Sequence, residues 1–136
     1  MTNEFAQGCA YVGEDYVPLS QAALPITDWG FLRGDCVYDA IPFSEGRLFR
    51  LRDHIDRFWE SMEKWRLECP LDKSAVHAVC HGCVSRSQLR SGLLLIITTR
   101  GLPPSSSTPI ARCPSWSRSW SARVACSPPM NRRPFE

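Results

Sequence analysis

The sequence predicts an α+β domain, in which an antiparallel sheet carries two helices. Residues 37–41 alternate apolar and polar side chains, as a half-buried strand does. Residues 55–65 repeat apolar side chains at spacings of three and four, which is typical of an amphipathic helix. Residues 92–99 form a nearly continuous apolar run, which favours a strand buried on both faces. Strands and helices mixed in this order indicate the α+β class.

The first half of the chain is expected to hold two short hairpins. One pairs residues 9–12 with 16–17, and the other pairs residues 37–41 with 47–51. Each hairpin is closed by a turn that contains glycine, and Gly46 can adopt the positive φ that a tight turn needs.

Charged residues at the expected helix ends support both predicted helices. Asp53 lies near the start of the first helix and Lys64 near its end, which is the order that the helix dipole favours. Asp72 is a suitable N-cap for the second helix, because its side chain can accept a hydrogen bond from a backbone N–H of the first turn. The second helix is expected to run through the apolar residues between Ala75 and Val84.

A change of composition divides the chain after Leu102. Up to that residue, eleven basic residues stand against thirteen acidic ones, whereas the rest holds five arginines and only Glu136. Seven of the eleven prolines also lie after Leu102. The sequence therefore predicts one domain at residues 1–102 and an irregular Pro/Ser/Arg-rich tail at residues 103–136. This tail is expected to be disordered, or to result from a truncation or reading-frame shift near Pro104.

The cysteines do not indicate a disulfide framework. There are seven, an odd number, and the polar N-terminus shows no secretory signal, so a cytoplasmic protein is expected. Cys80-His81-Gly82-Cys83, with His77, is a candidate metal site, but no second ligand pair accompanies it and Cys69 is the only other nearby candidate. We therefore expect no metal, and reduced cysteines buried on a helix.

Membrane and nucleic-acid partners are not expected either. No apolar run approaches the roughly 20 residues that a membrane-spanning helix needs. The basic tail holds Trp116 and Trp120, which could stack on bases, but no nucleic-acid-binding motif accompanies them.

Several motifs in a fixed order resemble a known family. They are Gly34-Asp35-x-Val37-Tyr38-Asp39, Gly46-x-Leu48-Phe49, His54-Ile55-Asp56-Arg57 and Thr98-Thr99-Arg100-Gly101. Together they resemble the N-terminal domain of the class IV (fold type IV) pyridoxal-phosphate-dependent aminotransferases, from about Tyr11 to Pro104. That family includes the branched-chain, D-amino-acid and (R)-amine transaminases and aminodeoxychorismate lyase. Cys36 departs from the Gly or Ala that is frequent in the family at its position.

The resemblance implies roles for three residues. Arg57 matches the arginine that contacts the cofactor phosphate; the alternative is an ion pair with Asp53 or Glu60 on the helix surface. Tyr38 matches a tyrosine of the substrate pocket; the alternative is an aromatic residue of the hairpin core. Arg100 matches an arginine that grips the substrate carboxylate; the alternative is that it ends a strand at the solvent edge.

Three neighbouring residues have lesser expected roles. In the same interpretation, Arg33 and Asp35 flank the pocket entrance. His54 is expected to be structural, as a satisfied polar group beside the helix start.

The resemblance implies a homodimeric enzyme that uses pyridoxal 5′-phosphate to move an amino group between an amino acid or amine and a 2-oxo acid. Such enzymes hold the cofactor as a Schiff base to a lysine of the following domain. Lys64 and Lys73 are the only lysines here, and both are expected to be solvated surface groups. We therefore expect this chain alone to be inactive. Two alternatives stay open: a non-catalytic truncated product or binding module, and a lyase like aminodeoxychorismate lyase.

Overall fold

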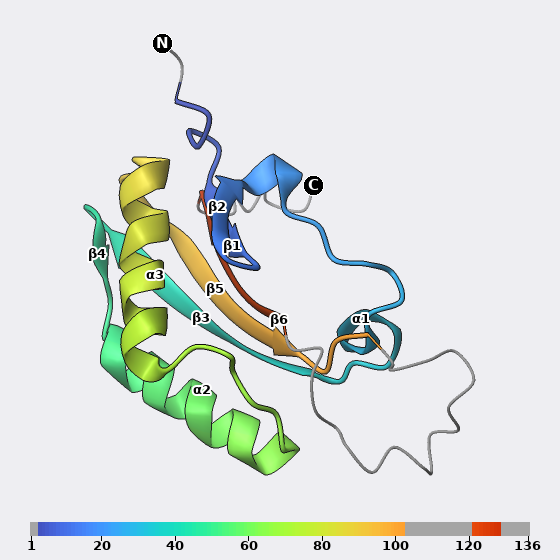
Figure 1. Ribbon diagram of the computed structural model, residues 1–136. Helices are drawn as coiled ribbons and strands as arrows, with labels where there is room; N and C mark the ends of the chain where they lie inside the picture. Colours follow the sequence, from blue (N-terminus) through green and yellow to red (C-terminus); the bar gives the residue numbers. More distant parts are fainter. Residues whose placement is uncertain (1–2, 103–120, 129–136) are drawn as a thin grey trace, which may run out of the picture.

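The computed structural model describes residues 3–102 and 121–128, which form a single curled antiparallel sheet with the two long helices, α2 and α3, on one face (Figure 1). The strand order is β2-β1-β6-β5-β3-β4. The elements are β1 (Cys9–Val12), β2 (Asp15–Pro18), the 3-10 helix η1 (Leu19–Gln21), α1 (Trp29–Leu32), β3 (Cys36–Ser44), β4 (Arg47–Leu48), α2 (Leu51–Trp65), α3 (Lys73–Ser87), β5 (Ser91–Thr99) and β6 (Ser121–Ser127). The predicted α+β class and the two long helices are confirmed.

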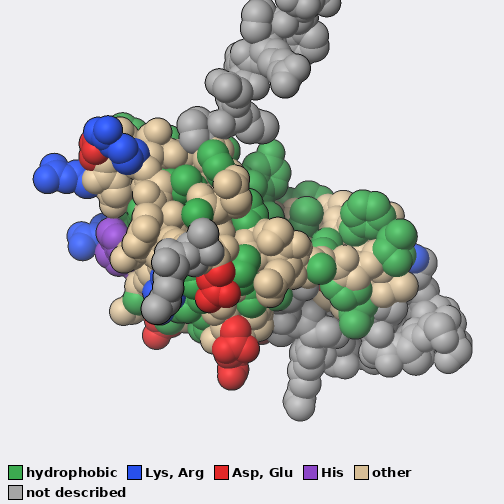
Figure 2. Space-filling view, turned by 90° about the horizontal axis from the view of Figure 1, so that it is seen from above, with side chains coloured by type: hydrophobic (Ala, Val, Ile, Leu, Met, Phe, Trp, Pro, Cys, Tyr) green, Lys and Arg blue, Asp and Glu red, His purple; other side chains and the backbone are tan. Residues whose placement is uncertain are grey.

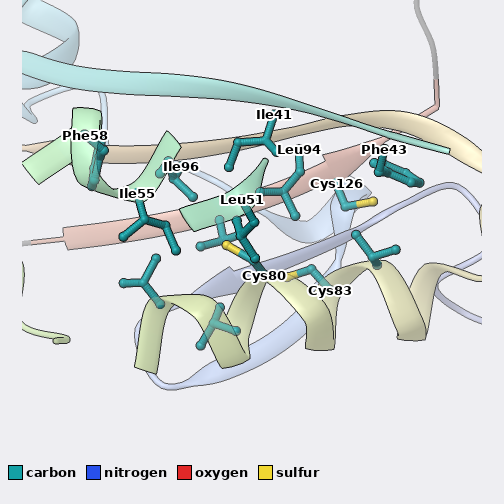
Figure 3. Packing of buried hydrophobic residues seen from close by; sticks show 14 of the residues in the cluster. Ile41, Phe43, Leu51, Ile55, Phe58, Cys80, Cys83, Leu94, Ile96 and Cys126 are labelled. Carbon is teal, nitrogen blue, oxygen red and sulfur yellow. The ribbon is translucent and has the colours of Figure 1, made fainter. Parts of the chain in front are cut away.

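The core lies between the sheet and the two long helices. Every second residue of β3 and β5 points toward α2 and α3, and each helix turns its apolar stripe to the sheet. Figure 3 shows the resulting cluster from close by. Its labelled members are Ile41, Phe43, Leu51, Ile55, Phe58, Cys80, Cys83, Leu94, Ile96 and Cys126.

The local signals at the helix starts differ in how well they predicted the structure. Asp72 caps α3 as expected, because its side chain accepts a hydrogen bond of 2.7 Å from the N–H of Ala75. The second strand of the β3–β4 hairpin was predicted over residues 47–51, which is too long. Arg50 takes a left-handed conformation (φ 47°), and α2 begins at Leu51, whose side chain is buried in the core.

β5 corrects the prediction of a strand buried on both faces. Leu94 and Ile96 are buried under the helices, whereas Leu93, Leu95 and Ile97 on the other face are only half-buried. Tyr38, the partner of Ile97 on β3, is 67% exposed. The apolar run thus reflects a second apolar face that neither α2 nor α3 covers.

Hydrophobic side chains also reach the surface around α1. Ile26, Phe31 and Leu32 are 71%, 63% and 58% exposed. Figure 2 shows hydrophobic side chains gathered on the α1 side of the molecule. An apolar surface of this kind is typical of a region that another protein surface covers.

β6 corrects the prediction that the whole segment after residue 102 is irregular. Seven of its residues pair with β5 on one side, and four of these also pair with β1 on the other. Val124 and Cys126 are buried, so the strand contributes to the core. β6 consists mostly of small and polar residues, which have only a weak preference for the strand conformation. Its conformation is therefore decided by its place between β1 and β5. Residues 103–120 and 129–136 of the predicted tail lie outside the described residues.

Candidate functional site

A buried carboxylate on β3 is the centre of the candidate site. Alternation along the strand turns Asp39 to the helix side, between Val37 and Ile41, and leaves its side chain 4% exposed. A carboxylate in such a place is costly unless cationic donors satisfy it.

The first half of α2 supplies those donors. Arg57 donates from Nε to Oδ2 of Asp39 at 2.7 Å and from Nη2 to Oδ1 at 2.7 Å. Nδ1 of His54, one turn earlier on the same helix, lies 2.8 Å from Oδ1. Since an ionised carboxylate only accepts hydrogen bonds, Nδ1 of His54 carries the proton and donates it. Asp39 therefore receives three hydrogen bonds from two residues of one helix.

The contacts keep the Asp39 carboxylate and the Arg57 guanidinium ionised at neutral pH. Burial raises the pKa of Asp39, but the hydrogen bonds and positive charge of Arg57 and His54 lower that pKa by more, so it lies below its ordinary value. The carboxylate in turn raises the pKa of Arg57. Near pH 7, Asp39 therefore stays a carboxylate and Arg57 stays a guanidinium, and neither group gains or loses a proton.

Arg57 also lines a shallow hollow of about 340 Å³, together with Phe49, Arg50, Asp53 and His54. Arg50 is paired there with Asp53 at 2.6 Å. The Arg57 side chain is 64% exposed, and none of the described residues accepts a hydrogen bond from its Nη1. The hollow thus presents the free edge of a guanidinium to solvent, which suits an anionic group such as a phosphate.

The structure brings Tyr38 and Arg57 to one sheet edge from opposite faces. In the described part of the chain, β4 pairs only with Phe43 and Ser44, so the stretch of β3 before them has a partner strand on one side only. Arg57 reaches that stretch from the helix face, and Tyr38 projects from the other face. The alternative that Tyr38 is a core aromatic residue is wrong, because it is exposed.

Arg100 is engaged inside the domain. Its Nε and Nη2 donate to the carboxylate of Asp35 at 2.8 and 3.1 Å, and its side chain is only 10% exposed. Nη1 and Nη2 also donate to the backbone carbonyls of Arg66 and Trp65, at 2.9 and 3.0 Å, where α2 ends. This geometry favours a structural role at the end of β5. The substrate role of Arg100 stays a prediction.

The remaining predicted residues are placed as follows. The guanidinium of Arg33 lies 4.8 Å from the ring centroid of Trp29, and Asp35 is the partner of Arg100, so their role at a pocket entrance stays a prediction. Lys73 pairs with Asp56 at 2.6 Å on the surface. Lys64 is exposed as well, so both lysines are surface groups as expected.

Of the Cys/His motif on α3, the two cysteines point into the core, whereas His77 and His81 are exposed. Cys80 and Cys83 are fully buried; burial raises the pKa of the Cys80 thiol to about 12 and also raises that of Cys83. Among the described residues no three or more His, Cys, Asp or Glu side chains gather as a metal site would need. The same part of the chain contains no helix long and apolar enough to cross a membrane.

Sequence reasoning missed the partner of Arg57. It considered Asp53 and Glu60 on the same helix, whereas the structure pairs Arg57 with Asp39 on β3. A signal was available, because the alternation that predicted the strand puts Asp39 on the same face as Val37 and Ile41. A carboxylate on a buried face calls for a cation from a neighbouring element.

Comparison with known proteins gives D-alanine and branched-chain amino acid aminotransferases among the relatives. D-alanine aminotransferase of Listeria monocytogenes serotype 4b is 30% identical over 91 residues, which are 67% of this chain and 32% of the relative. The branched-chain amino acid aminotransferase from Escherichia coli has the same fold over 90% of this chain and 41% of its own, with a TM-score of 0.75 and 16% identity. A T.th. branched-chain amino acid aminotransferase, complexed with N-(5′-phosphopyridoxyl)-L-glutamate, gives a TM-score of 0.75 at 21% identity, over 90% and 40% of the two chains. No family model matches the chain. The chain spans about a third of the length of the curated relatives it matches.

Proposed function

The relatives of this chain are aminotransferases of class IV, of which it matches an N-terminal part, and from this we propose that it forms the N-terminal domain of a pyridoxal-phosphate-dependent transaminase. The complete enzyme would move an amino group between an amino acid or amine and a 2-oxo acid. The observation that carries the proposal is the open edge of the Arg57 guanidinium in its hollow.

The residues of the hollow suit the phosphate of the cofactor. Arg57 would hold that phosphate through Nη1 and Nη2, because two parallel N–H donors match two phosphate oxygens. When bound, the cofactor supplies an electron sink for the carbon from which a proton is removed. Asp39 keeps the guanidinium at the wall of the hollow, and the exposed ring of Tyr38 would help to shape the substrate side.

This part of the enzyme is inactive alone under the proposal. Transamination needs an amine that reacts with the cofactor and moves the substrate proton. Lys64 and Lys73 are exposed, and Lys73 is tied to Asp56, so neither amine is desolvated beside the hollow. The catalytic amine would come from the part of the enzyme that the relatives have in addition.

We also propose that the complete enzyme is a cytoplasmic homodimer. Support for a covering partner comes from the exposed apolar side chains around α1 and from the half-buried outer face of β5. Buried thiols with raised pKa suit a reducing compartment, since they take no part in disulfides among the described residues.

Binding of pyridoxamine 5′-phosphate tests the proposal. This form of the cofactor has no aldehyde, so it does not react with the surface lysines. We expect it to shift NMR signals of residues around the hollow, and pyridoxamine without the phosphate to bind at least about tenfold more weakly. Equal binding of the two compounds would contradict the phosphate site.

Two arginine variants complete the test. Arg57→Met should abolish the binding. Arg90→Met is the matched control, because Arg90 also holds a carboxylate, that of Glu45, through Nε and Nη2, but on another part of the surface. Unchanged binding by the Arg57 variant would remove Arg57 from the phosphate site.

A further inference from the structure

We propose that Asp39 and His54 are positioning residues, which fix the Arg57 guanidinium so that its free edge faces the anion. The inference rests on the proposed function, in which Arg57 takes the cofactor phosphate. It goes beyond that function because it assigns a task to two residues that do not themselves hold the phosphate.

The first step is that Asp39 is the fixed member of the cluster. It stands on β3 opposite Ile96 of β5, inside the sheet and under α2, with 4% of its side chain exposed. A strand residue paired in this way cannot follow a mobile partner into solvent. Arg57 on the helix surface must therefore come to the carboxylate, and its long side chain gives up most of its rotamers before any ligand arrives.

The second step is an account of the donors of Arg57. A guanidinium has two edges at which two N–H groups run parallel. The Nε–Nη2 edge is occupied by Asp39, at 2.7 Å on both oxygens. The Nη1–Nη2 edge has no carboxylate among the described residues, and the side chain is largely exposed. Fixing one edge thus decides where the other edge points.

The third step concerns His54, which shares an oxygen with Arg57. Nδ1 of His54 and Nη2 of Arg57 both reach Oδ1 of Asp39 and lie 3.2 Å apart. Because Nδ1 carries the proton, these two nitrogens are both donors, and the oxygen between them holds them together. The imidazole therefore closes one side of the guanidinium and limits its rotation about the carboxylate.

A positioning role of Asp39 predicts a change in anion binding opposite to the change expected from charge alone. The negative charge of Asp39 offsets the positive charge that would attract a phosphate. If charge alone mattered, removing it would strengthen anion binding. If positioning matters, Asp39→Asn should weaken anion binding, because an amide offers one acceptor where Arg57 needs two.

The test measures pyridoxamine 5′-phosphate binding to the wild-type chain and to Asp39→Asn, with the Arg57 Nε–H signal followed by NMR. We expect about tenfold weaker binding and loss of the slowly exchanging Nε–H signal. Glu45→Gln is the matched control, since it removes one negative charge from an arginine-paired carboxylate that lies outside the hollow. It should leave binding unchanged. Binding to Asp39→Asn that is as tight as wild type would overturn the proposal.

The wild-type protein alone gives a second measurement, which does not depend on whether Asp39→Asn folds. The Nε–H of Arg57 should exchange with solvent much more slowly than that of Arg90, whose carboxylate partner is on the open surface. Equal exchange rates would overturn the positioning role. Slow exchange without any ligand binding would leave the positioning role intact and refute the proposed phosphate site.

Discussion

Replacing Arg100 with methionine is expected to lower the free energy of unfolding by about 2–4 kcal/mol. The side chain joins three parts of the fold: the end of β5, Asp35 before β3, and the last carbonyls of α2. The substitution removes four hydrogen bonds, each worth roughly 1 kcal/mol net, and leaves a carboxylate without its counter-charge. The side chains of Arg100 and Asp35 are 10% and 17% exposed, so water replaces these contacts only in part.

Urea and thermal unfolding followed by circular dichroism measure this loss. A fall in Tm of about 10 °C or more corresponds to the expected change for a domain of this size. Arg90→Met is the control, because Arg90 and Glu45 are 83% and 65% exposed and such a pair contributes little, about 0–1 kcal/mol. If both variants have the same free energy of unfolding, the contacts of Arg100 do not stabilise the fold, and its predicted role toward a substrate carboxylate gains support.

Three further predictions concern single residues. Asp39→Asn should reduce the loss of unfolding free energy that occurs as the pH falls. The lowered pKa of Asp39 stabilises the wild-type fold above about pH 4, and this contribution is lost as the pH falls further. Urea unfolding of the wild type and of the variant should therefore give similar free energies at low pH. Thr98→Val should raise the free energy of unfolding by about 1 kcal/mol. The buried Thr98 hydroxyl has no oxygen or nitrogen partner among the described residues, and the Cys69 thiol beside it is only a weak hydrogen-bonding group. A lower Tm for the variant would refute this prediction. Gly82→Ala should destabilise α3 despite the better helix propensity of alanine, because the added Cβ would overlap the ring and hydroxyl of Tyr16. If urea unfolding shows instead that the free energy of unfolding rises by about 1 kcal/mol, the Tyr16 ring moves aside.

Local patterns were sufficient to predict most of the fold. Asp72 marked the start of α3 because capping is a property of a few neighbouring residues. The hairpin of β1 and β2 was likewise predicted from its alternation and its turn. The strand at residues 121–127 could not be predicted in this way, since its hydrogen bonds go to β1 and β5, far away in the sequence.

The site shows the same division. Arg57 could be singled out because its motif is local, and its role toward a phosphate stays a prediction, whereas its partner depends on how β3 packs against α2. Arg100 was identified by its motif too, but the carbonyls that it binds belong to the end of another helix. Donor and acceptor types are visible in a sequence, and their pairing across elements is a property of the packed chain.

The position of β6 in the middle of the sheet has a consequence for synthesis. Within residues 3–102 and 121–128, the N-terminal hairpin of β1 and β2 joins the rest of the sheet only through β6, so it must wait for residues 121–127 to leave the ribosome. Until then, β1 and β5 each expose an unpaired edge, which can pair with another chain. The long separation between Cys9 and its partner Cys126 makes this closure a slow, late event in folding. Until β6 is in place, the chain therefore has two open strand edges at which it can aggregate.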